Sequence, residues 1–148
     1  MRRICFLPAL LLMGQLAARA SVAGECWTER KHGHEARAEA CFTALTRSSD
    51  AYLRAEGFWG LEQWSRANEQ FRLATQPADS QAFYKVRWGL LLHERFNNAD
   101  AAGLFREALQ KDPSNAEAYI GLARVSADSF DGQATAYLRK AVDRKSVV

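Results

Sequence analysis

The sequence predicts an all-α fold, an αα-hairpin repeat superhelix of about three repeats. Three observations carry this prediction. Apolar residues recur at the period of an amphipathic helix in several stretches, and these stretches follow one another at nearly constant intervals. The segment "AAGLFREALQKDPSNAEAYIGLA" (101–123) also stops one helical pattern at Asp112-Pro113 and restarts another almost at once. A helix that stops and restarts so soon indicates paired helices.

The apolar stripes are the strongest of the three observations. The clearest one, with positions at i, i+3, i+4, i+7 and i+8, comprises Ala101, Leu104, Phe105, Ala108 and Leu109. The same spacing recurs in Ala134, Tyr137, Leu138, Ala141 and Val142. Shorter matches are Ala67, Phe71 and Ala74, and Ala38, Cys41, Phe42 and Leu45. The leading alanines are 29, 34 and 33 residues apart. Small residues around one bulky side chain let helices approach closely, so we expect hairpins that bury one another's apolar faces.

The ends of the helices carry their own signals. Pro113 ends one repeat, because proline cannot continue the helix that precedes it. Ser114 or Asn115 can cap the helix that follows. The stretches "NNAD" (97–100) and "FDGQ" (130–133) supply turn and cap residues between paired helices.

The first 20 residues are typical of a secretory signal peptide. Two arginines precede an apolar run over residues 4–16, and Ala-Arg-Ala ends at residue 20. The apolar run is short for a membrane span, so we expect cleavage near Ala20 or Gly24, and the alternative is an uncleaved anchor. The sequence therefore predicts an exported protein, periplasmic or extracellular. We expect it to have an N-terminal linker at 21–33, a helical repeat domain at 34–142 and no stable membrane span after cleavage.

The net charge of the chain depends on this leader. The leader carries three arginines and no acid, so its removal lowers the formal net charge from +3 to zero. A neutral chain with scattered charges offers no basic surface for nucleic acid or anionic lipid. We therefore expect no nucleic-acid partner.

Two cysteines remain in the exported chain, Cys26 and Cys41. In an oxidising compartment two cysteines suggest one disulfide. The alternative is a reduced Cys41 buried on a helix face. The spacing of these cysteines gives no support to redox catalysis, which usually uses a Cys-x-x-Cys pair.

The repeat resembles the tetratricopeptide (TPR) repeat. That pattern has a small residue at its eighth position, Ala at the twentieth, an aromatic residue at the twenty-fourth, Ala at the twenty-seventh and Pro at the thirty-second. Residues 82–115 supply Gly89, Ala101, Phe105, Ala108 and Pro113 at those places. The next repeat, with one residue deleted, supplies Ala123, Ala134, Leu138 and Ala141.

A narrower resemblance covers residues 26–142. The stretches "CWTER", "RAEACF", "YKVRWGLLLHERFNNADAAGLFREAL" and "AYIGLA" resemble the N-terminal part of exported bacterial TPR proteins. Those proteins carry a C-terminal zinc-metallopeptidase-like domain with an HExxH helix. The resemblance implies a repeat scaffold in front of an enzyme domain that this sequence lacks.

The last six residues, "DRKSVV" (143–148), depart from the repeat pattern. The pattern calls for an apolar residue and then Asp-Pro, whereas Arg144, Lys145 and Ser146 follow. We expect a truncated or non-native tail, and the alternative is a genuinely short chain. Repeat arrays need a polar capping helix, so an apolar stripe without one predicts self-association at the C-terminal end.

Binding of a protein or peptide of unknown identity is the function that the TPR resemblance implies. Side chains of the first helices in such arrays line a concave groove, and we expect about half of the candidates to be exposed. By repeat register these candidates are Phe83, Val86, Leu90, His93, Glu94, Ile120, Arg124 and Asp128. A less regular repeat at 48–78 adds Tyr52, Glu56 and Trp59. The alternative is a non-catalytic N-terminal fragment of a longer TPR-metallopeptidase.

Two histidine-containing stretches could carry metal chemistry. "HGHE" (32–35) places two imidazoles and a carboxylate within four residues, but a polar loop is the simpler interpretation. "HERFN" (93–97) begins like a zincin helix but has Asn97 where the second histidine is required. Because no other catalytic motif is present, we expect no enzyme activity, no catalytic residues, no cofactor and no metal.

Overall fold

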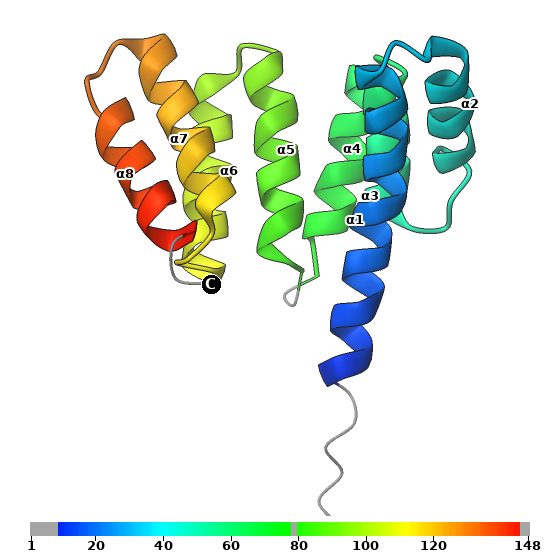
Figure 1. The fold of residues 1–148 in the computed structure, drawn as a ribbon, viewed down its shortest axis with the longest axis horizontal. Helices are drawn as coiled ribbons and strands as arrows, with labels where there is room; N and C mark the ends of the chain where they lie inside the picture. Colours follow the sequence, from blue (N-terminus) through cyan, green and yellow to red (C-terminus); the bar gives the residue numbers. More distant parts are fainter. Residues whose placement is uncertain (1–8, 78–79, 146–148) are drawn as a thin grey trace, which may run out of the picture. The chain divides into compact units, whose positions relative to one another are not determined.

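The computed structural model describes residues 9–77 and 80–145, with side chains from 20 to 77 and from 80 to 143. All regular structure in these ranges is helical, which confirms the all-α prediction (Figure 1). The helices are α1 (Ala9–Lys31), α2 (Glu35–Leu45), α3 (Ala51–Gly60), α4 (Trp64–Thr75), α5 (Ala82–Glu94), α6 (Asn98–Lys111), α7 (Ala116–Ser129) and α8 (Ala134–Lys145). Residues 1–8 of the expected signal peptide and 146–148 of the expected tail lie outside the described residues. Within these ranges, no helix is both long and apolar enough to cross a bilayer.

The helices form two compact units. Unit 1 ends at Gln63 and contains α1, α2 and α3, which all pack against one another. Unit 2 begins at Trp64, and in it α4, α5, α6, α7 and α8 each pack on the next helix in sequence (Figure 1). In unit 2, α5 also contacts α7. Packing between sequence neighbours is the repeat-like arrangement that the apolar stripes indicate.

The same backbone turn follows α1, α3, α5 and α7. In each turn a residue just beyond the regular helix is left-handed, with φ of 75° at Gly33, 58° at Glu62, 60° at Phe96 and 53° at Phe130. Its N–H donates to the carbonyl three residues back, and the next N–H donates to the carbonyl five residues back, which is a Schellman motif. The last three of these residues are 34 apart, so the period of the sequence is also a period of the backbone.

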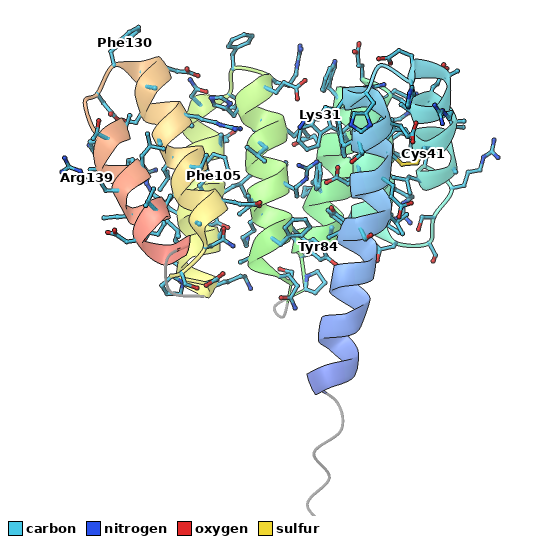
Figure 2. All side chains as sticks on the ribbon, in the orientation of Figure 1. Lys31, Cys41, Tyr84, Phe105, Phe130 and Arg139 are labelled. Atoms are coloured by element: carbon cyan, nitrogen blue, oxygen red, sulfur yellow. A yellow bond between two sulfur atoms is a disulfide. The ribbon has the colours of Figure 1, made fainter. Side chains whose placement is uncertain are left out.

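Phe105 of α6 occupies the centre of the core of unit 2. Its side chain is completely buried, and Figure 2 shows it within this unit. A methyl group added to Gly89 of α5 would lie 2.7 Å from the ring, and one added to Gly121 of α7 would lie 2.5 Å from it. The ring therefore fits between two helices only because both present a glycine. Other residues of this core are Val86, Ala101, Ala102, Ala108, Ala118 and Leu122.

The caps of α6 and α7 follow the sequence prediction. Asn97 begins the cap of α6, and the side-chain oxygen of Asn115 accepts a hydrogen bond from the N–H of Ala118 at 2.9 Å. Of the two candidates for the α7 cap, the structure therefore uses Asn115. Ser114 instead donates its hydroxyl to the Asp112 carboxylate at 2.6 Å.

Unit 1 is held together by a disulfide and by one buried ring. A disulfide joins Cys26 of α1 to Cys41 of α2, with 5.4 Å between the Cα atoms (Figure 2). Phe42, completely buried, lies against the backbone of α3, where methyl groups on Gly57 or Gly60 would clash with it. Small residues thus serve the same purpose in unit 1 as in unit 2.

Part of the segment expected to be a linker, residues 21–33, is helical. Residues up to Lys31 belong to α1, and Ala23 and Cys26 are buried. Ala23, Cys26, Trp27 and Arg30 stand at i, i+3, i+4 and i+7, which is the spacing of one helix face. The sequence predicts a linker or N-terminal segment here because the residues of "GECWTERKHGHE" are mostly polar, and the spacing of this helix face is the signal that indicates a helix instead.

Candidate functional site

The predicted groove residues of α5 and α7 fall on two helices in contact. Phe83, Leu90 and His93 of α5 and Ile120 of α7 are partly exposed. Glu94 of α5 is exposed, and so are Arg124 and Asp128 of α7. We call these seven residues the candidate groove. Their chemistry is mixed, with apolar side chains toward the N-terminal ends of the helices and charged ones toward the C-terminal ends.

His93 and Asp128 link the two helices directly. His93 Nε2 lies 2.9 Å from an oxygen of the Asp128 carboxylate. The His93 side chain is 21% exposed and that of Asp128 is 48% exposed. The bond places the C-terminal ends of α5 and α7 side by side, so a ligand that reached one of these residues would also meet the other.

Val86 does not belong to the candidate groove, although the repeat register placed it there. It is completely buried and packs in the core around Phe105. Leu90 lies one helical turn further on and remains partly exposed, although it also packs against this core. The register identifies the correct stripe of α5, but the packing of α6 and α7 decides which residues of that stripe are covered.

The three candidates of α3 are also buried. Tyr52 is 2% exposed, Glu56 is 0% exposed and Trp59 is 6% exposed. The indole N–H of Trp27 donates to a carboxylate oxygen of Glu56 at 2.7 Å, and the Trp27 ring lies 5.1 Å from the Trp59 ring. These residues are therefore corrected from groove to interior positions of unit 1, because α1 packs against α3 where a linker was expected.

The end of α1 is tied to this interior by a cation. The guanidinium of Arg30 lies over the Phe42 ring, 4.9 Å from its centroid, and donates to the carbonyl oxygen of Gly60 at 2.6 Å. A cation is attracted by the face of an aromatic ring and by the negative C-terminal end of a helix. Arg30 therefore stabilises the packing of α1 against both α2 and α3. The polar side chains near Trp27, those of Arg30 and Glu56, thus stabilise the packing of the helices within unit 1.

The histidines of "HGHE" lie at the turn after α1. His34 Nδ1 is 2.8 Å from a carboxylate oxygen of Glu29, and the His32 and His34 rings are 6.1 Å apart. In the part of the chain that the structure describes, no three metal-binding side chains come together. The contacts of His34 are those of a surface ion pair that joins the end of α1 to the start of α2.

Two carboxyl groups with lowered pKa values, Asp112 and Asp131, lie at turns, whereas the pKa of Glu69 within α4 is lowered chiefly by a hydrogen bond from Arg72. Hydrogen bonds from the Ser114 hydroxyl and N–H, and from the Asn115 amide, hold the pKa of Asp112 below its usual range. The Ser126 hydroxyl and the Gln133 N–H do the same for the pKa of Asp131. Both carboxylates accept hydrogen bonds at a helix boundary, so their chemistry is that of caps.

Two exposed residues were not singled out from the sequence. Phe96 and Phe130 are 87% and 94% exposed and occupy the left-handed positions after α5 and α7. Figure 2 shows Phe130 pointing away from the body of unit 2. Their 34-residue spacing was the available signal, but an exposed phenylalanine runs against the default expectation that large apolar residues are buried.

Comparison with known proteins adds no relative. No protein-family model matches the chain, and no curated protein matches it significantly. The function must therefore be argued from the geometry of the chain itself.

Proposed function

We propose that the chain is an exported tetratricopeptide-like scaffold that binds a segment of another protein through the candidate groove. The observation that carries the proposal is the contact of α5 with α7, two helices in equivalent positions of successive hairpins. Between them they present partly exposed apolar side chains together with exposed charged ones. Such mixed surfaces are typical of protein interfaces.

Three further features support the repeat class. The last three Schellman turns are spaced 34 residues apart, which is the length of one tetratricopeptide repeat. Phe105 stands at the aromatic position of the pattern and packs between Gly89 and Gly121. Ala101 and Ala108, on either side of it, are buried at the small positions. No other repeat class in common use combines this length with paired helices and this order of small and aromatic residues.

Two features support export. The N-terminal residues follow the pattern of a secretory leader, and the Cys26–Cys41 disulfide is of a kind that persists in oxidising compartments. Ala23 and Cys26 are buried side chains of α1, and cleavage at residue 20 would keep both of them in the mature chain.

A second candidate function is the scaffold part of a longer exported protein with a metallopeptidase-like domain. The observation that favours it lies on α8, where Leu138 is 47% exposed. The equivalent position of α6 is Phe105, which α7 covers. A further hairpin would cover Leu138 in the same way. Sequencing the native locus across the codon for Asp143 would decide between the two candidates.

The groove proposal can be tested with a displayed library of random 12-residue peptides selected on the purified chain. Selected peptides should bind the Arg124→Glu and Ile120→Ser variants at least about tenfold more weakly, because charge reversal or truncation at an interface centre commonly costs that much. Arg106→Glu is the matched control, since Arg106 is an exposed arginine of α6 outside the groove. Equal binding by Arg124→Glu and Arg106→Glu would overturn the proposal.

A further inference from the structure

Phe96 and Phe130 are the most exposed large apolar side chains among the described residues. Each follows the first helix of a hairpin, and each lies in a left-handed conformation. A bulky residue at positive φ is disfavoured by contact of its Cβ with the backbone. Phenylalanine is therefore unfavourable at these two positions for two reasons. The backbone has a positive φ, and the apolar ring is exposed to solvent.

The turn itself does not require phenylalanine. The same Schellman motif is built with Gly33 after α1 and with Glu62 after α3. Glycine is the residue that this position favours, because it lacks a Cβ. The phenyl rings therefore contribute nothing that the turn needs, and their exposure leaves them no role in the core of unit 2.

Both rings lie at the same end of unit 2. Phe96 is three residues beyond His93, and Phe130 is two residues beyond Asp128. The 2.9 Å bond between His93 and Asp128 brings these chain segments together. The two phenylalanines therefore follow neighbouring helix ends of unit 2, and we call the pair the phenylalanine ledge.

The surroundings of the ledge are acidic. Within four residues of either phenylalanine the sequence has four acids and one basic residue other than histidine: Glu94, Asp100, Asp128 and Asp131, and Arg95. The Arg95 guanidinium lies over the Trp64 ring, 5.0 Å from its centroid, so this cation is engaged with α4. An acidic rim repels anionic lipid and attracts basic side chains.

We propose that the phenylalanine ledge docks a segment of another protein in which large apolar side chains stand next to lysine or arginine. The apolar side chains would cover the two rings, and the basic ones would meet the acidic rim. Exposed aromatic residues are the type that most often dominates a protein interface. The two rings of the ledge lie at the turns, outside the candidate groove, whereas Glu94 and Asp128 of the acidic rim belong to both surfaces. The rings carry the proposal, which therefore does not rest on groove binding.

The structure supplies a variant that removes the ledge without weakening the fold. In the double variant Phe96→Gly/Phe130→Gly, glycine replaces a residue at positive φ in both turns, so the melting temperature should rise. Glu62→Gly is the matched control, because it makes the same change in the equivalent turn and leaves both rings in place. Lost binding in a more heat-stable protein cannot be attributed to unfolding.

The probe is a displayed library of random 12-residue peptides, selected on the full chain after depletion on the double variant. We expect peptides rich in lysine or arginine beside leucine, phenylalanine or tryptophan. They should bind the double variant at least about tenfold more weakly than the wild type. Glu62→Gly and the groove variant Ile120→Ser, which changes no charge near the acidic rim, should bind them as the wild type does, and this separates the ledge from the groove. Added salt should weaken binding.

Three results would overturn the proposal. The first is that no peptide distinguishes the wild type from the double variant. The second is that the selected peptides are acidic or uncharged. The third is that vesicles of phosphatidylcholine and phosphatidylglycerol sediment with the wild type but not with the double variant, which would make the ledge a lipid-binding feature.

Discussion

One aromatic ring determines how closely three helices of unit 2 approach one another. Phe105 is fully buried, and the backbones of α5 and α7 reach it only where Gly89 and Gly121 lack a side chain. Protein interiors are packed as densely as organic crystals, so a single added methyl group is felt. The other core residues near the ring are mostly alanines, which leave it no space to move into.

The Gly121→Ala substitution tests this packing. The new methyl group would lie 2.5 Å from the Phe105 ring, so the free energy of unfolding should fall by about 1–3 kcal/mol, although alanine is the better helix former. Gly103→Ala is the control, because nothing lies within 4 Å of a methyl group there, and it should raise the free energy of unfolding by up to about 1 kcal/mol. Urea denaturation followed by far-UV circular dichroism measures both. Similar effects of the two substitutions would contradict the packing argument.

Asp112 makes the stability of the α6–α7 connection depend on pH. Its pKa is lowered chiefly by the Ser114 hydroxyl, so the folded state favours the ionised carboxylate. A lowered folded-state pKa contributes stability above the unfolded-state pKa, and this contribution is lost as pH falls through the folded value. Asp112→Asn should therefore be less stable than wild type at pH 7, and the difference should shrink as the pH falls below the ordinary aspartate pKa of about 3.9. Thermal melts across this range check it, and a difference that grows on acidification would refute it.

At the scale of elements, α1 shows how one helix changes the interpretation of its neighbours. Tyr52, Glu56 and Trp59 of α3 are buried, and Trp27 of α1 hydrogen-bonds to Glu56 and packs against the Trp59 ring. If α1 is left out of account, the repeat register predicts that these α3 residues line a groove. With α1 in place they are an interior with one buried carboxylate, whose hydrogen bond offsets part of the cost of its burial.

The disulfide should account for much of the stability of unit 1. It links residues 15 apart in sequence, and closing a loop of that size in the unfolded chain stabilises the folded state by about 3 kcal/mol. The Cys26→Ala/Cys41→Ala variant should therefore lower the midpoint at which Trp27 fluorescence reports unfolding. A reductant should reproduce this shift in the wild type and have no effect on the variant. An unchanged midpoint after reduction would show that noncovalent contacts alone hold α1.

The sequence predicted the helices correctly where the local apolar pattern matches the face that is buried in the structure. Helices α6 and α8 were predicted because their stripes are regular, and α5 and α7 followed from the 34-residue repeat pattern, with Pro113 between α6 and α7. Asn115 as a cap followed from the same reasoning. Helix α1 was missed because its short apolar face is interrupted by charged residues that a loop would also carry. The Cys26–Cys41 pairing remained one of two alternatives until the Cα–Cα distance was known.

The candidate site was less predictable than the fold, for a physical reason. Val86 and Leu90 are four residues apart on one stripe, and only the three-dimensional packing of α6 and α7 shows that the first is covered. The burial of Glu56 depends on Trp27, which is 29 residues away. The exposure of a side chain depends on such contacts between residues far apart in sequence. The helical period of a stripe depends only on residues that are close together in sequence.

At the scale of the whole molecule, the described helices bury their apolar faces against sequence neighbours, and α8 is the last of them. Leu138 is 47% exposed, whereas Phe105 at the equivalent place in α6 is completely buried. Exposed apolar side chains on a helix face favour association with a second copy of the chain. We therefore expect the chain to self-associate through α8.

A single substitution on α8 tests that expectation. Leu138→Lys places a charge at the exposed apolar position and should weaken self-association by more than about tenfold, since burial of a leucine contributes about 2 kcal/mol. Ala136→Lys is the control, because Ala136 is exposed on another face of the same helix. Sedimentation velocity over a range of concentrations measures both. A monomeric wild type, or equal effects of the two lysines, would rule out α8 as the interface.

The disulfide also has a mechanical consequence for unit 1. A pulling force applied to the N-terminal part of α1 would pass from Cys26 to Cys41 through covalent bonds, so that Trp27 and Arg30, which lie between them in sequence, would bear no tension. The oxidised chain should extend roughly 45 Å less than the reduced chain when it is stretched to full length, because 15 residues at about 3.4 Å each are replaced by one bridge. An unfolding enzyme that pulls this protein from its N-terminus would therefore reach the disulfide before it reached the buried aromatic residues.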